Sequence, residues 1–366
     1  MRRHGIHEYT RKTTPTAILV GVFSCLIGRD EARDLLIAHG ADTLNHPGGT
    51  LLAHLGRVEA RLAAWGARDD LRLAGLCHAF YGTDGFAEHL LPLERRDELA
   101  AAIGTEAEEI VYLYASCDRE FSYPGIGRED GLFRDRFTGE TLTPTAMQRR
   151  DFAELTAANE LDVLRENREL WDRHGGALLK LFTRWRPLLS EAAFKDARGL
   201  LRLEGEERAA FLRGLERGDV VTGVVAVIAS FGVTFVELGG VEAMMNIPEV
   251  SWRPVDTPAD VIAEGEEHAF EVLDVDIDRE RVSLSLKALE PDPMAAFARA
   301  GFDGVRTATV THVVTFGVLV EVAPGVHGVL HKDDLGDRAP GEGDELAVEV
   351  TAVNLVTRRL GLRLHG

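Results

Sequence analysis

The stretch Gly218–Val250, GDVVTGVVAVIASFGVTFVELGGVEAMMNIPEV, decides how the second half of this 366-residue chain folds. Its apolar residues recur with a period of two, and glycines interrupt the pattern at short intervals. This period is typical of β-strands that bury one face, and closely spaced glycines indicate tight turns. The stretch therefore predicts a small β-sheet, to which residues 265–289 add two further strands.

The same pattern occurs a second time along the chain. Residues 305–335 align with the quoted stretch, so that Thr315-Phe316-Gly317 matches Ser230-Phe231-Gly232. Residues 343–364 then align with 265–289 and end in a comparable last strand. A repeat of about eighty residues predicts two copies of one small β-domain.

Each copy resembles the S1-type RNA-binding domain over almost its whole length. The segment 272–289, VLDVDIDRERVSLSLKAL, is very similar to the closing strands of that family. The resemblance implies two five-stranded OB-type β-barrels, over residues 216–290 and 300–366. Such barrels bind single-stranded nucleic acid by stacking bases on aromatic side chains and holding phosphates with basic ones. We therefore expect single-stranded RNA or a ribonucleoprotein as partner.

Seven residues stand at the binding-face positions of that family. They are Phe231, Phe235, Asp276 and Arg281 in the first copy, and Phe316, His331 and Arg359 in the second. Each copy also departs from the family: Asn246 replaces a histidine, Leu319 an aromatic residue and Asn354 an aspartate. Two alternatives stay open, because exposed phenylalanines also pack at a barrel rim and such barrels also dock protein partners.

The first half shows helical periodicity from Asp30 to about Gly214. One helix is predicted to begin after Thr50, run to Trp65 and stop at Gly66. A second is predicted from about Asp70 to Phe80, and a third from about Thr105 to Arg119. In the second helix the small residues Ala74 and Gly75 predict a close approach by another helix.

Each of these three helices is predicted to point one side chain of a kind that binds metal, a histidine or an aspartate, towards a common core. His54 and His78 take inward positions, and Asp118 is a carboxylate on an otherwise apolar face. A buried carboxylate is costly unless it is paired or bound to metal. Taken singly, an inward histidine is more often a hydrogen-bonded core residue, and Asp118 is a plausible polar helix end. The three together form a hypothesis of a metal site.

The segment His54-Leu-Gly-Arg-Val58, then Cys77-His78, then Asp118 resembles the motif order of the HD superfamily of helical metalloproteins. The segments HPGGTLLAHL, LAGLCHAFYGTDGF and VYLYASCDR are similar to an uncharacterised bacterial family of this type. The resemblance implies an all-α HD-like domain over residues 30–145, with metal held by His54, His78 and Asp118. Ala79 stands where the family has a metal-bridging aspartate, which puts a dinuclear site in doubt.

Two histidines and one carboxylate suit a single divalent ion, namely iron, manganese or zinc. His46 and Asp84 are the candidate catalytic bases near this site. Residues 146–215 are expected to be a helical extension or linker. Within it, Glu160 and Asp162 could reach the core, but the pattern favours a solvated helix face.

Net charge and cysteine content indicate which partners and which cellular compartment to expect. The formal net charge of -19 argues against bulk attraction to nucleic acid or to an anionic membrane. Three widely spaced cysteines do not form a disulfide framework and suit a reducing cytosol. Residues 1–29 are an uncertain extension, with basic residues before a short apolar run, as in a signal peptide. The run is too short to span a bilayer. No A-x-A site follows it, so we expect a cytoplasmic protein without a membrane partner.

The sequence thus predicts a multidomain α + β protein, with an all-α domain followed by two barrels. Its leading functional hypothesis is an RNA-associated, metal-dependent phosphohydrolase. One alternative is a mononuclear non-haem iron oxygenase that acts on a small molecule. The other is a non-enzymatic regulator that binds RNA or docks a protein and whose metal site is degenerate. The sequence predicts no oligomeric state.

Overall fold

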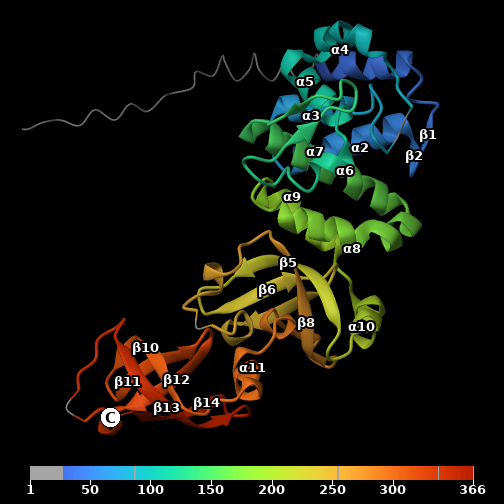
Figure 1. The fold of residues 1–366 in the computed structure, drawn as a ribbon. Helices are drawn as coiled ribbons and strands as arrows, with labels where there is room; N and C mark the ends of the chain where they lie inside the picture. The colour runs from blue at the N-terminus through green and yellow to red at the C-terminus, as the bar shows by residue number, and fades with distance from the viewer. Residues whose placement is uncertain (1–27, 86–87, 254, 337, 366) are drawn as a thin grey trace, which may run out of the picture. The chain divides into compact units, whose positions relative to one another are not determined.

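The computed structural model describes residues 28–85, 88–253, 255–336 and 338–365. Residues 1–27 of the predicted N-terminal extension lie outside this description. The chain divides into two compact units that meet between Arg202 and Leu203. Figure 1 colours the helical unit blue to green and the β-rich unit yellow to red. Within the described residues, no helix is both long and apolar enough to cross a membrane.

The first unit is built from helices with two short hairpins. Residues 28–38 are helical. The further helices are α2 (Leu51–Ala64), α3 (Asp69–Cys77), α4 (Arg96–Ile103), α5 (Thr105–Ala115), α6 (Arg119–Ser122), α7 (Ala146–Glu166), α8 (Arg168–Arg184) and α9 (Glu191–Leu201). The hairpins pair β1 (Asn45–His46) with β2 (Gly49–Thr50), and β3 (Phe133–Arg134) with β4 (Thr141–Leu142).

The local signals for α2 act as predicted. The Thr50 hydroxyl accepts a hydrogen bond from the Ala53 amide and so caps the first turn. Trp65 is the C-cap, and Gly66 follows with φ 80°, a conformation that favours glycine. The helix therefore begins and ends where the sequence predicts.

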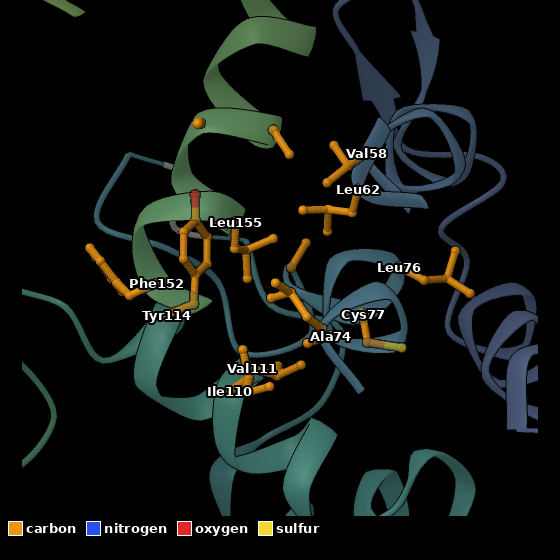
Figure 2. Close-up of a cluster of buried hydrophobic side chains, with 14 of the residues drawn as sticks. Val58, Leu62, Ala74, Leu76, Cys77, Ile110, Val111, Tyr114, Phe152 and Leu155 are labelled. Carbon is orange, nitrogen blue, oxygen red and sulfur yellow. The ribbon is translucent and has the colours of Figure 1, made fainter. Parts of the chain in front are cut away.

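The core of this unit lies between α2, α3, α5 and α7 (Figure 2). The expected close approach at Gly75 is confirmed. A Cβ atom at Gly75 would lie 2.4 Å from Leu62 Cδ1 of α2, so no larger side chain fits without movement. Phe152 and Leu155 of α7 belong to the same buried cluster, so α7 packs in the core with the three earlier helices.

The structure corrects three details of the predicted helices. α3 ends at Cys77, and His78 is its C-cap. α5 ends at Ala115, because Asp118 has an extended backbone (φ -77°, ψ 102°) and caps the short helix α6 instead. Asp162 of α7 is only 1% exposed, so the prediction of a solvated face was wrong for this residue.

The second unit begins with α10 (Gly205–Arg213) and the first β-domain. Its strands are β5 (Val220–Ile228), β6 (Val233–Glu237), β7 (Glu242–Asn246), β8 (Glu267–Asp276) and β9 (Arg281–Ser285). They close into a barrel in the order β5-β6-β7-β9-β8, with β7 and β9 parallel. Leu212 of α10 is buried with the barrel core, which includes Phe270 and Val272.

The second β-domain repeats this order. After α11 (Pro293–Ala300) come β10 (Val305–Val314), β11 (Gly317–Ala323), β12 (Val326–His331), the short helix α12 (Lys332–Leu335), β13 (Glu345–Asn354) and β14 (Arg359–Leu364). The sheet order is β12-β11-β10-β13-β14, and β12 lies beside β14. The closing hairpins correspond residue by residue, since Asp276 pairs with Arg281 and Asn354 pairs with Arg359.

Candidate functional site

A groove of about 630 Å³ on the second β-domain brings together the three residues predicted there. Phe316 lies in the turn between β10 and β11, His331 ends β12, and Arg359 begins β14. The Phe316 and His331 ring centroids are 6.1 Å apart, and Phe316 is 53% exposed. An open aromatic pair beside a guanidinium can stack a base and hold its phosphate.

Two arginines, Arg358 just before β14 and Arg359 at its start, supply the positive charges of this groove, and Asp334 supplies one negative charge. Arg358 has φ 51°, a left-handed conformation that ends the β13–β14 turn. Its side chain pairs with Asp292 at 2.9 Å, and it lines the groove together with Arg359. Arg359 forms no ion pair with another described residue, so its charge is available to a ligand.

The Asn354 side chain shapes the same turn. Its Oδ1 accepts hydrogen bonds from the amides of Val356 and Thr357. In the first domain Asp276 Oδ1 accepts from the Arg279 amide, three residues on, in the same way. One oxygen acceptor suffices for this turn, so the change from aspartate to asparagine preserves its geometry.

The first barrel presents its predicted residues in a more acidic setting. Phe231 is 74% exposed, Phe235 is partly buried on β6, and Arg281 begins β9 beside Asp276. Residues 216–290 contain 16 Asp and Glu against 5 Lys and Arg, whereas residues 303–364 contain 9 against 6. A phosphate chain is therefore repelled more strongly by the first barrel than by the second.

The helical unit holds a second candidate site, a cavity of about 270 Å³. His54 of α2 is central to its wall. Its Nδ1 lies 2.7 Å from Asp162 Oδ2, and its Nε2 lies 3.0 Å from Asn159 Oδ1. Arg57 donates from Nε and Nη2 to the two Asp162 oxygens, both at 2.8 Å. The buried carboxylate is thus fully paired, which offsets its desolvation.

Two further histidines surround His54. His46 stacks on it, with ring centroids 4.0 Å apart, and the His78 ring stands edge-on at 5.3 Å. His78 Nδ1 donates to the Gly75 carbonyl at 2.8 Å, and Asn159 also hydrogen-bonds the His78 ring. Burial, with His54 nearby, lowers the pKa of His78 to about 3 and that of His46 to about 4. Both rings are therefore neutral at pH 7.

Of the other residues predicted for this site, Asp118 and Asp84 lie outside the cavity lining and His46 lies within it. The Asp118 carboxylate accepts from the Phe121 amide and lies 3.6 Å from Arg134. It does not line the cavity, whereas His54 and His78 both do. Asp84 Oδ2 accepts from the Arg119 amide at 3.0 Å, and His46 lines the cavity.

These placements do not form a three-ligand metal centre. In the described ranges, no three His, Cys, Asp or Glu side chains are grouped to hold an ion. Both nitrogens of His54 already face partners, and Asp162 is held by Arg57. The three donors predicted from the sequence are therefore not gathered around one point in this structure, and metal binding stays a prediction.

Sequence reasoning missed four residues of the helical site, namely Arg57, Arg119, Asn159 and Asp162. The available signal was the polar run Asn159-Glu160-Leu161-Asp162 inside the long helix α7, in which three of the four side chains face the site or its wall. Arg119 lines the cavity, and its Nη1 donates to Glu160 Oε1 at 3.1 Å.

Comparison with known families agrees with the division into halves. Residues 215–287 and 303–364 match the S1 RNA binding domain, so the second half carries two S1-type domains. Residues 35–119 match a family described as "Domain of unknown function (DUF6817)". That description states neither fold nor activity, so the resemblance to the HD superfamily stays a prediction.

Curated relatives match somewhat less than half of this chain. The chain is 42% identical over 169 residues to "Small ribosomal subunit protein bS1" of Mycobacterium tuberculosis (strain CDC 1551 / Oshkosh), covering 44% of this chain and 35% of that protein. It is 36% identical over 174 residues to the bS1 homolog of Bacillus cereus (strain ATCC 10987 / NRS 248), covering 45% and 44%. The chain thus spans less than half the length of either relative.

A solved structure shows a partial likeness. The a/eIF2alpha-aDim2p-rRNA complex from Pyrococcus horikoshii OT3 contains a chain with 30% identity and a TM-score of 0.20. The match covers 23% of this chain and 52% of that chain.

Proposed function

We propose that this protein binds single-stranded RNA through its second S1-type domain. The observation that carries the proposal is the groove in which Phe316, His331 and Arg359 converge from three separate elements. Aromatic stacking accepts any base, and a guanidinium supplies a phosphate contact, so the groove suits a single strand of mixed sequence. The S1-type match of residues 303–364 supports this choice.

The net charge of the chain determines how strong the RNA binding is and how strongly it depends on salt. With a net charge of -19, long-range attraction to RNA is absent, and contacts within the groove supply the affinity. We therefore expect modest affinity, dominated by stacking, with a shallow dependence on salt. The first barrel is more acidic and contributes less, through Phe231.

The test is a titration of labelled single-stranded RNA at two salt concentrations. Phe316→Ala removes a stacking platform worth roughly 1–3 kcal/mol, so affinity falls about tenfold or more. Arg359→Gln costs less and lowers the salt dependence, because one phosphate contact is lost. Phe231→Ala is expected to have a smaller effect than Phe316→Ala.

Arg363→Gln is the matched control. Arg363 lies on the same strand, is exposed and does not line the groove, so the variant loses the same charge outside the proposed site. It is expected to bind RNA as the wild type does. Equal, weak binding by every variant would instead indicate a docking module for a protein partner.

The helical unit is the candidate enzymatic part of this proposal. Metal-dependent hydrolysis of a phosphate ester remains its first predicted activity, and oxidation at a single iron its second. Elemental analysis of the purified full-length chain separates both from a scaffold role. Iron with oxygen uptake favours oxidation, and manganese or zinc favours hydrolysis.

A further inference from the structure

The cavity of the helical unit contains an arginine with unused donors. Arg119 Nη1 donates to Glu160, but Nε and Nη2 of Arg119 have no hydrogen-bond partner among the described residues. The Arg119 side chain is 27% exposed and lines the cavity, so solvent reaches it. A guanidinium is a fork of five N–H donors that matches a carboxylate or phosphate.

The other polar groups that line the cavity leave few oxygen or nitrogen atoms to coordinate a cation. A hydrogen-bonded chain runs from Arg57 through Asp162, His54 and Asn159 to His78. Both oxygens of Asp162 are occupied in this chain. Glu160 is the one carboxylate among the residues described as lining the cavity, and it faces Arg119.

The apolar part of the lining indicates an organic ligand. Pro47, Leu51, Ala79, Val163 and Leu170 line the cavity together with the polar groups. A volume of about 270 Å³ accommodates a compact molecule and not a polymer. Such a surface buries an apolar body while Arg119 pairs with a charged end.

We propose that this cavity binds a small organic anion, a carboxylate or a phosphate monoester, through the Arg119 guanidinium. Glu160 occupies one donor of Arg119 when the cavity lacks the anion and competes with it for that donor. The proposal concerns the helical unit alone and does not depend on RNA binding by the second S1-type domain.

The experiment measures binding of butyrate and of methyl phosphate to the full-length chain by calorimetry. Arg119→Gln is expected to weaken binding at least about tenfold, because a charge-assisted contact is lost. Glu160→Gln is expected to strengthen it, because the competing carboxylate is gone. A preference for butyrate or for methyl phosphate identifies the charged end of the ligand.

Arg128→Gln is the control, because Arg128 is 70% exposed in the same unit and pairs only with Asp130 among the described residues. It is expected to leave anion binding unchanged. Equal binding by wild type and Arg119→Gln overturns the proposal, as does weaker binding by a folded Glu160→Gln. If a chelator abolishes anion binding, a metal ion and not Arg119 recognises the ligand, and the proposal is also overturned.

Discussion

At the scale of single residues, the Phe-Gly pair places a glycine with positive φ in the turn after the first strand of each β-domain. Gly317 has φ 154°, and a Cβ atom there would lie 2.1 Å from the Leu330 carbonyl oxygen. Gly232 has φ 88°, and its Cβ would lie 2.5 Å from Ile247 Cδ1. Gly317 therefore lets the chain pass close to the backbone of β12, and Gly232 lets it pass close to Ile247, just after β7, while the preceding phenylalanine stays exposed in both domains.

We expect Gly317→Ala to destabilise the second S1-type domain by about 2 kcal/mol or more. A backbone oxygen cannot move aside as a side chain does, and the positive φ adds strain. Chemical denaturation followed by circular dichroism measures the change. Gly341→Ala is the control, because the nearest atom to its Cβ is 3.9 Å away and its φ is ordinary. Equal stability of the two variants would contradict this account.

Residue-level prediction worked where a residue's role is local. Thr50 and Gly66 bound α2 because capping depends on neighbours in the chain. It was wrong for Asp118, because helical spacing alone predicts that α5 continues through this residue. The carboxylate instead caps α6, a role that depends on where the chain turns.

At the scale of elements, helix α7 supplies the polar side chains that hydrogen-bond His54 in the helical site. Its core-facing residues include the apolar Phe152 and Leu155, but also Asp162 and the partly buried Asn159. Helical periodicity predicted the helix but not its polar face. His54 and Asp162 are 108 residues apart in the chain, and no local pattern pairs them.

Asp162→Ala is expected to destabilise the helical unit by about 3–5 kcal/mol. The variant leaves Arg57 and His54 without their shared carboxylate, and the loss of one partner of a buried pair is strongly destabilising. Thermal unfolding followed by circular dichroism measures this. Asp172→Ala removes an exposed carboxylate of α8 that pairs with Arg168, and such a pair contributes about 0–1 kcal/mol. A similarly small effect of Asp162→Ala would show that the pair is solvated.

At the scale of the whole molecule, the two halves differ in how far the sequence determines them. The β-domains were predictable because the repeat supplies the same strands, turns and exposed aromatic residues twice. The helical cavity was predictable only in part. His54, His78 and His46 were assigned to it, whereas Arg119 and Asn159 join it through packing between distant helices.

The two cavity histidines predict that acid destabilises the helical unit. The pKa of His78 is lowered to about 3 and that of His46 to about 4, so the unfolded chain binds more protons below pH 6.5. Their contribution to stability is complete above pH 6.5 and is lost as the pH falls towards 4. Below pH 6.5, a fully buried histidine lowers the free energy of unfolding by about 1.4 kcal/mol for each pH unit. The half-buried His46 lowers it by less. Around His78 stand His54 of α2, His46 of β1, Tyr114 of α5 and Asn159 of α7.

The measurement is urea unfolding at pH 7.5 and pH 5, followed by tryptophan fluorescence. Trp65, Trp171 and Trp185 report on the helical unit, and Trp252 reports on the first barrel. Asp162, with its pKa lowered to about 2, stays ionised over this range, so the loss reports on histidines. His78→Gln is expected to flatten the pH dependence, and the exposed His174→Gln is expected to keep it. Wild-type stability that is equal at both pH values would mean that water reaches both rings and that the helical cavity opens in solution.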